Sequence, residues 1–310
     1  MPEPLPLCHL DGVLQPLRAA RVSPLDRSFL FGDGIYEVIA ARRGVALRLE
    51  HNLARLARSL GEVRIRNPHP PGEWRRLVYE LIDANGGGDV YVYLQVSRGA
   101  EYGRNHAPLP DIAPTVFAFC APLPLPGPGT LESGIRCITA PDTRWARCDI
   151  KSVALLANVL LRQQAVDAGA AETILLREGQ LTEASSSAVH VVIGGEIRTP
   201  PRTPRLLPGT TRGFIEELAA GAGILPHHAG RRGRAARCRG DLGERGDPRR
   251  RPGHAARRPA GGRRPPWSGV AAHARADRGR LGAGAALRRA GRDAGAPAAR
   301  RLSRRAGCGR

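Results

Sequence analysis

The sequence predicts a mixed α/β protein with two domains, followed by a C-terminal tail without regular structure. Segments with strand periodicity and segments with helix periodicity alternate over the first 228 residues. A stretch rich in proline and glycine interrupts them at residues 121–129, and both periodicities stop near Ala229. The chain has 310 residues, which is enough for two domains of ordinary size.

Residues 1–120 are expected to form an N-terminal α/β domain. Apolar residues alternate with polar or aromatic ones between Val90 and Val96, which is typical of a strand. Two amphipathic helices are predicted before this strand, and the second should end near Asn85, where three glycines follow. Their apolar faces consist of Leu53, Leu56, Ala57 and Leu60 in the first helix, and of Trp74, Leu77, Val78, Leu81 and Ile82 in the second.

Residues 121–130 are expected to form an interdomain linker, because the proline-rich run of residues 121–129 can hold neither a helix nor a central strand. Residues 131–228 would then form the C-terminal domain. Its predicted elements are a strand near 135–140, a helix over 152–168 closed by Gly169, strands at 173–176 and 188–193 around the Glu178-Gly179 turn, and a helix over 211–220.

Residues 229–310 form the predicted tail. This segment contains one valine and no isoleucine, phenylalanine or tyrosine, so it cannot bury enough apolar surface to offset its chain entropy. It is therefore expected to be disordered. One explanation is an arginine-rich arm that binds nucleic acid. A reading-frame error in the gene is favoured, because a one-base shift of GC-rich codons for residues 241–255 can encode a strand, a Ser/Thr turn and a second strand.

The positive charge of the chain is concentrated in this tail. The net charge is +20, and residues 231–310 supply +19 of it through 24 arginines and 5 acidic residues. The nearly neutral body argues against nucleic acid as its partner. The six cysteines include no CxxC pair, and no apolar stretch reaches the roughly 18 residues of a membrane span. We therefore expect a cytoplasmic protein with reduced thiols, no metal site and no membrane contact.

Lys151 is the only lysine among the 48 basic residues of the chain. It lies between a predicted strand and a predicted helix, in the partly apolar segment Arg144–Ser152. An apolar environment lowers the pKa of a lysine and makes its amine nucleophilic. Any lysine-dependent reaction must use this residue, and an ordinary surface lysine is the alternative interpretation.

Two other segments could bind charged parts of a ligand. Glu183 is expected at a strand-to-loop junction, before three serines, although this run is also compatible with a plain polar turn. The run Leu-Leu-Pro-Gly-Thr-Thr-Arg opens the last predicted helix, where free backbone N–H groups and the hydroxyls of Thr210 and Thr211 could bind a phosphate. A simple helix cap is the alternative for that run.

Two loops complete the set of candidate segments. The run Phe31–Glu37 contains two glycines that permit a tight turn before Tyr36. Arg104 and His106 are two residues apart in the loop after the strand at 90–96, where they could clamp a carboxylate. Solvated loop side chains are the alternative in both cases. Each segment alone is weak evidence, whereas the order and spacing of all of them are specific.

Over residues 9–228 the chain resembles the fold-type IV pyridoxal-phosphate aminotransferases of class IV. These include D-amino-acid transaminase, branched-chain aminotransferase and aminodeoxychorismate lyase. The segments that carry the resemblance are Phe31–Glu37, Arg144–Leu161 and Thr182–Ser187. The resemblance implies a two-domain fold with pyridoxal 5′-phosphate in the cleft between the domains, a homodimer, and amino acids and 2-oxo acids as substrates.

The resemblance also implies roles for individual residues. Lys151 looks like the lysine that joins the cofactor as a Schiff base and moves the proton of the substrate Cα. Glu183 resembles the carboxylate that keeps the pyridine nitrogen protonated, which makes the ring an electron sink. The other positions that match cofactor or substrate contacts are Tyr36, Arg55 as the phosphate arginine, Arg144, Ser187, and Thr210 and Thr211 at the phosphate-binding helix start.

Arg104 and His106 decide the subgroup. An Arg-x-His at this place resembles the carboxylate trap that D-amino-acid transaminases contribute across a dimer interface, and branched-chain enzymes usually lack it. The predicted activity is therefore transfer of the amino group of a D-amino acid such as D-alanine to a 2-oxo acid. The alternatives are a branched-chain aminotransferase, an aminodeoxychorismate lyase, an inactive homologue, and a nucleic-acid-binding protein that acts through its basic tail.

The chain departs from the family pattern in three places. Asn52 alters the spacing before Arg55, so the register of that arginine is open by one residue. Ala188 stands where an asparagine often follows the serine run. The arginine-rich tail replaces the last third of the family, which normally supplies a strand and a Ser/Thr-rich turn at the phosphate. Whether the chain as written is active is therefore left open.

Overall fold

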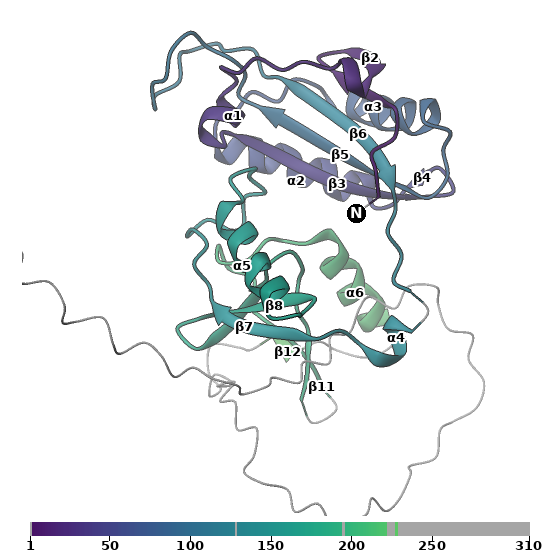
Figure 1. The fold of residues 1–310 in the computed structure, drawn as a ribbon, viewed down its shortest axis with the longest axis vertical. Coiled ribbons are helices and arrows are strands. Elements are labelled where there is room, and N and C mark those ends of the chain that lie inside the picture. The colour runs from purple at the N-terminus through teal and green to yellow at the C-terminus, as the bar shows by residue number, and fades with distance from the viewer. Residues whose placement is uncertain (1, 128, 194–195, 222–226, 229–310) are drawn as a thin grey trace, which may run out of the picture. The chain divides into compact units, whose positions relative to one another are not determined.

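The computed structural model describes residues 2–127, 129–193, 196–221 and 227–228 (Figure 1). Helices and strands are mixed along this part of the chain, as the sequence predicts. The predicted tail of residues 229–310, with Cys238 and Cys308, lies outside the described residues.

The N-terminal region is built on a six-stranded antiparallel sheet with the strand order β2-β1-β6-β5-β3-β4. The strand predicted at residues 90–96 is β5, which lies between β6 and β3. The other strands were not predicted individually. The strands are β1 (Leu7–Leu10), β2 (Val13–Pro16), β3 (Gly34–Arg42), β4 (Val45–Ala46), β5 (Val90–Ser97) and β6 (Val116–Pro122).

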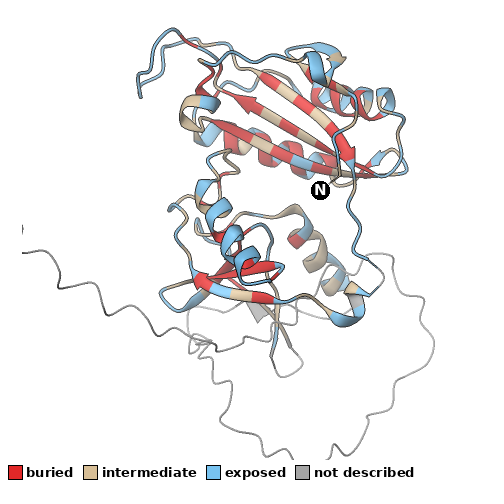
Figure 2. Ribbon diagram, viewed as in Figure 1, coloured by how far each residue is buried: buried red, intermediate tan, exposed pale blue. Residues whose placement is uncertain are grey.

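The two predicted amphipathic helices are α2 (Leu49–Glu62) and α3 (Pro71–Ala84), and both cover one face of this sheet (Figure 1). Proline fits the first turn of α3 because that position needs no N–H partner. Burial alternates along β3 and β5, so one face of each strand joins the core (Figure 2). Two short helices, η1 (Leu17–Ala19) and α1 (Arg27–Phe31), precede β3.

The predicted linker begins later than the sequence indicates. Ala121 and Pro122 are the last residues of β6 and pair with Tyr91 and Val90 of β5. The expectation that this run holds no central strand is therefore wrong at its first two residues. Pro122 is tolerated because it ends the strand, where its missing N–H costs little. The linker also ends one residue before its predicted end at residue 130, because Thr130 begins the short helix α4 (Thr130–Ser133).

The C-terminal region contains two three-stranded sheets. In the first, β7 and β8 are parallel and are joined through helix α5, and β8 and β9 form an antiparallel hairpin. Gly169 has a positive φ just after α5 and closes that helix, as predicted. The elements of the region are β7 (Cys137–Pro141), α5 (Leu156–Asp167), β8 (Glu172–Arg177), β9 (Gln180–Ala184), β10 (Val191–Ile193), β11 (Glu196–Thr199), α6 (Thr210–Gly221) and β12 (His227–His228).

The hairpin partner of β8 differs from the prediction. Glu178 and Gly179 both have positive φ values, of 55° and 75°, and form a two-residue turn that leads directly into β9. The predicted strand at residues 188–193 is reduced to β10, and β10 pairs with β11 instead. The sequence of β9 is largely polar, so its strand character was not visible without the turn geometry.

Helix α5 starts later than predicted, at Leu156 instead of Ser152. The residues before it bond to β3 instead: the backbone N–H of Tyr36 donates to the carbonyl of Lys151, and that of Val153 donates to the carbonyl of Gly34, each at 3.0 Å. Pairing with the start of β3 therefore overrides the helical tendency of this segment. It also fixes the backbone at Lys151.

Candidate active site

Lys151 lies in the connection between β7 and α5, beyond the carboxyl end of a strand in a parallel pair. Ligands of α/β sheets commonly bind at this edge. Ser152, the next residue, forms an isolated bridge with Ile35 of β3. The lysine is thus held between the first strand of one sheet and the beginning of β3 in the other.

The surroundings of Lys151 make its amine easier to deprotonate. Its Nζ atom lies 4.2 Å from the centre of the Tyr36 ring. Burial lowers the pKa of Lys151 to about 8, and the charge of Arg55 acts in the same direction, whereas Glu37 and Glu183 oppose both. A large fraction of the amine is therefore neutral near pH 8, which is the form that attacks a carbonyl or accepts a proton.

Tyr36 belongs to an aromatic row on the face of the sheet away from α2 and α3. Its ring stacks on Tyr93 at 5.6 Å between centres, and Tyr93 stacks on Phe119 at 5.2 Å. Burial, followed by the charge of Glu37, raises the pKa of Tyr36, so its hydroxyl stays protonated at neutral pH. The row fixes the ring that contacts the amine of Lys151.

Glu183 is the penultimate residue of β9 and is linked to a chain of charges. Its Oε2 atom accepts a hydrogen bond from Nη1 of Arg144 at 2.5 Å. Arg144 also donates from Nε to the fully buried carboxylate of Asp142 at 3.0 Å, and Thr182 donates to the same carboxylate at 2.8 Å. Burial raises the pKa of Glu183, and the guanidinium of Arg144 opposes this by stabilising the ionised carboxylate.

Arg55, on α2, forms a buried two-bond ion pair with Glu37 of β3. Its Nε and Nη2 atoms donate to the two carboxylate oxygens at 2.8 and 2.6 Å. The remaining nitrogen, Nη1, donates to the carbonyl of Pro208 at 3.1 Å, just before α6. The structure therefore places Arg55 at the start of α6, and Asn52 lies between them through weak contacts with Arg55 and Thr210 at 3.4 and 3.5 Å.

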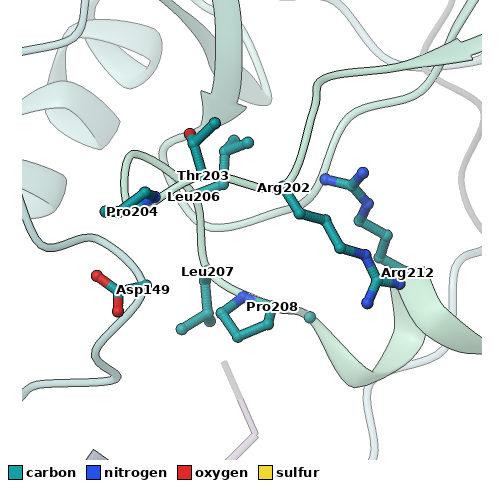
Figure 3. A pocket seen from close by; sticks show the side chains of 9 residues that line it. Asp149, Arg202, Thr203, Pro204, Leu206, Leu207, Pro208 and Arg212 are labelled. Atoms are coloured by element: carbon teal, nitrogen blue, oxygen red, sulfur yellow. The ribbon is translucent and has the colours of Figure 1, made fainter. Parts of the chain in front are cut away.

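The start of α6 borders two basic cavities. The cavity shown in Figure 3 lies along the 202–209 segment, and its lining residues are Asp149, Arg202, Thr203, Pro204, Leu206, Leu207, Pro208, Gly209 and Arg212. The adjacent cavity is lined by Arg48, His51, Ala54, Arg55, Arg58, Arg202, Pro208, Gly209, Thr210, Gly213 and Glu217. Helix starts present unpaired N–H groups, so this second cavity combines a helix dipole with arginine side chains, a combination that suits a phosphate.

The structure brings six of the predicted site residues into this one place. They are Tyr36, Arg55, Arg144, Lys151, Glu183 and Thr210. Thr211 is exposed and does not line either cavity. Ser187 is also exposed, and its hydroxyl donates to Glu172 at 3.2 Å.

Arg104 and His106 lie in the loop between β5 and β6, where both side chains contact Phe31. The Arg104 guanidinium lies 5.0 Å from the centre of the Phe31 ring, and the His106 ring lies 5.5 Å from it. Both residues are exposed. Their contacts are thus with α1, next to the glycine-rich turn that leads to Tyr36.

Three of the buried acidic residues that were not predicted hold predicted site residues. Glu37 pairs with Arg55, Asp142 with Arg144, and Glu172 accepts hydrogen bonds from Ser185, Ser186 and Ser187. Only Glu37 gave a readable signal, because strand alternation places it on the same face as the apolar Ile35 and Ile39. A carboxylate on a core face predicts a buried cationic partner.

The family sequence pattern described as Amino-transferase class IV matches residues 34–231. The chain belongs to the class IV aminotransferases. This aminotransferase is 40% identical over 214 residues to a D-alanine aminotransferase from Bacillus licheniformis, which covers 69% of this chain and 75% of the relative. It is 38% identical over 211 residues to a D-alanine aminotransferase from Staphylococcus haemolyticus, which covers 68% and 74%.

Solved structures show the same fold. A branched-chain amino acid aminotransferase from T.th., solved with pyridoxamine 5′-phosphate, has a TM-score of 0.67 and 25% identity, and the match covers 72% of this aminotransferase and 76% of that chain. The branched-chain amino acid aminotransferase from Escherichia coli has a TM-score of 0.65 and 22% identity over 72% and 76%. The fold-type IV architecture implied by the sequence resemblance is thus confirmed.

The described residues also bear on metal ligands, membrane spans and the state of the cysteines. In residues 2–127, 129–193, 196–221 and 227–228, no group of three or more His, Cys, Asp or Glu side chains is arranged to hold a metal. Within the same ranges, no helix is long and apolar enough to cross a membrane. The four cysteines described, Cys8, Cys120, Cys137 and Cys148, are buried free thiols.

Proposed function

We propose that this aminotransferase transfers the amino group of a D-amino acid such as D-alanine to a 2-oxo acid, with pyridoxal 5′-phosphate as cofactor. The observation that carries the proposal is the position of Lys151, whose amine has a pKa of about 8 and lies among Tyr36, Arg55 and Glu183. Two D-alanine aminotransferases at 38–40% identity support the choice of substrate class.

The residues fit the three reactive parts of pyridoxal phosphate. The amine of Lys151 suits the aldehyde, because it is partly neutral near pH 8. The start of α6 at Thr210, with Arg55 beside it, suits the phosphate. Glu183 suits the pyridine nitrogen, because Arg144 keeps a carboxylate charge in a buried position.

When bound, the cofactor supplies an electron-poor ring that accepts the electron pair left on the substrate Cα. The chain would contribute the proton transfer and the charges. Lys151 would accept the substrate Cα proton on Nζ and would pass it to the former aldehyde carbon of the cofactor, so that the amino group stays with the cofactor. Glu183 would hold its negative charge at the ring nitrogen, and Asp142 would keep Arg144 aimed at Glu183. Ser187 and Thr211 are exposed, and their hydroxyls would contact the cofactor from the edge of the site.

The substrate carboxylate would be bound by Arg104 and His106, acting across the interface of a homodimer. A guanidinium and an imidazole two residues apart can each donate to a carboxylate. In the part of the chain that the structure describes, the Arg104 guanidinium has no carboxylate partner, so its charge is available. Tyr36 would lie on the inner side of the substrate, next to Lys151.

The proposal is tested by an amino-donor assay with 2-oxoglutarate as the acceptor. The holoprotein should form pyruvate from D-alanine and should show little activity with L-leucine, and Lys151→Ala should lower the activity with D-alanine by a factor of at least about 10². Activity confined to L-leucine would instead assign the branched-chain reaction. Absence of turnover with either donor, together with no visible absorbance after reconstitution with pyridoxal phosphate, would identify an inactive homologue.

A further inference from the structure

Arg27 is a buried arginine that the sequence analysis did not single out. It is the first residue of α1 and is only 3% exposed. Its Nη1 atom donates to the carbonyl of Asn105 at 2.7 Å, and its Nη2 atom donates to the carbonyl of His106 at 3.0 Å. One guanidinium therefore holds the backbone of the loop that carries Arg104 and His106, beside α1 (Figure 1).

Two carboxylates hold Arg27 itself. Its Nε donates to Asp33 at 2.9 Å, and its Nη1 makes a buried ion pair with Glu101 at the beginning of the same loop. The second oxygen of Glu101 accepts the backbone N–H of Leu109 at 3.0 Å. The segment 101–109 is thus tied at both ends and in the middle to one buried charge pair, which we call the Arg27–Glu101 clasp.

Phe31 connects this clasp to the two exposed side chains. Arg27 lies 4.6 Å from the centre of the Phe31 ring, Arg104 lies 5.0 Å from it, and the His106 ring contacts it at 5.5 Å. The ring therefore supports the side chains, while Arg27 and Glu101 support their backbone. Such an arrangement restricts both residues before any ligand arrives.

We propose that the Arg27–Glu101 clasp is a positioning device that presets Arg104 and His106 for the carboxylate of the amino-acid substrate. This inference rests on the proposed function. A loop that is ordered in advance loses less conformational freedom on binding, so the benefit appears as affinity for the carboxylate. The chemical step at Lys151 lies elsewhere and is not expected to depend on the clasp.

The test is Glu101→Gln, which keeps an acceptor for the N–H of Leu109 but removes the charge that holds Arg27. We expect KM for D-alanine to rise about tenfold, because a charge-assisted hydrogen bond is weakened, with kcat within about twofold of the parent. Binding of propionate, which has the carboxylate but no amine, should weaken by a similar factor in a calorimetric titration. The visible absorbance of bound pyridoxal phosphate should not change.

Glu80→Gln is the matched control, because Glu80 pairs with Arg76 on the exposed surface of α3. It should leave KM and propionate binding unchanged. If Glu101→Gln does not fold, as judged by circular dichroism, Phe31→Leu replaces it, with the same expected rise in KM and weakening of propionate binding.

The outcomes separate the two proposals. If the parent protein does not turn over D-alanine, the proposed function fails. If the parent is active but the variant loses kcat with KM and propionate binding unchanged, the positioning role of the clasp is wrong. The positioning role is also wrong if kcat, KM and propionate binding of the variant all equal those of the parent.

Discussion

The N-terminal sheet region and the C-terminal region of this aminotransferase differ in how they are held together. In the first, the sheet and helices α2 and α3 share one continuous apolar core. Among the residues of the second region that the structure describes, buried apolar side chains form two small clusters, and Leu156 of α5 is 72% exposed. Lys151 and Glu183 nevertheless lie in the second region. Glu183 is held there by ion pairs. Lys151 is held by backbone pairing with β3 and by its neighbour Ile150, which packs into the large core of the first region.

The largest predicted effect concerns the amine of Lys151. Replacing it in Lys151→Ala should lower kcat for D-alanine by a factor between about 10² and 10⁴, because a positioned proton-transfer group is lost. Arg136→Lys would restore a lysine elsewhere in the same region and should not restore activity in the Lys151→Ala background. Recovery of activity in the double variant would show that catalysis does not require the lysine at position 151.

Core truncations should distinguish the two regions by stability. Trp74→Ala removes a side chain that is 1% exposed in the large core, and about 3–5 kcal/mol of unfolding free energy should be lost. Leu161 lies in a small cluster with Ala140 and Leu175, and Leu161→Ala should lower the free energy of unfolding by about 2 kcal/mol. Urea unfolding measures both. Equal losses would show that the C-terminal region is as tightly packed as the sheet region.

The next effect concerns the buried charges behind Glu183. Asp142→Asn should lower the free energy of unfolding by about 1–3 kcal/mol, because the group that accepts hydrogen bonds from Arg144 and Thr182 loses its charge. The matched control is Glu50→Gln, because Glu50 and Arg75 form an exposed pair, and its loss should leave the free energy of unfolding nearly unchanged. A smaller loss for Asp142→Asn than for Glu50→Gln would contradict the role given to ion pairs in this region.

The smallest effect is a shift in titration of the sole lysine. Acetylation of Lys151 in the apoprotein should reach half its maximal rate near pH 8, because burial lowers its pKa and only the neutral amine reacts. In denaturant the midpoint should move up toward the ordinary value of 10.5. Peptide mass spectrometry follows the reaction. A midpoint above pH 10 in the folded protein would mean that the amine is fully solvated.

Sequence periodicity predicts an element correctly where one face of that element is apolar. It predicted β5, α2 and α3, because these elements pack on a single core. It failed where contacts with another element override the local tendency. The segment from Lys151 to Leu155 is apolar enough for a helix, but its backbone bonds to the start of β3 instead of forming the first turn of α5.

Motif reasoning reached the groups of the candidate site but not their supports. Lys151 and Glu183 were selected by rarity and by resemblance, and the structure places them near each other. Glu37 and Arg27 could not be selected in this way, because their partners Arg55 and Glu101 are distant in sequence. Asp142 is only two residues from its partner Arg144, but no motif marked it. Their identification requires the register of β3 and the path of two loops.

The central claim is that the ε-amine of Lys151 joins the aldehyde of pyridoxal phosphate. Borohydride reduction of the reconstituted protein, followed by digestion and mass spectrometry, tests this directly. The pyridoxyl mass should appear on the peptide that contains Lys151 and should be absent from the amino terminus. A reduced protein with no added mass on that peptide would contradict the claim.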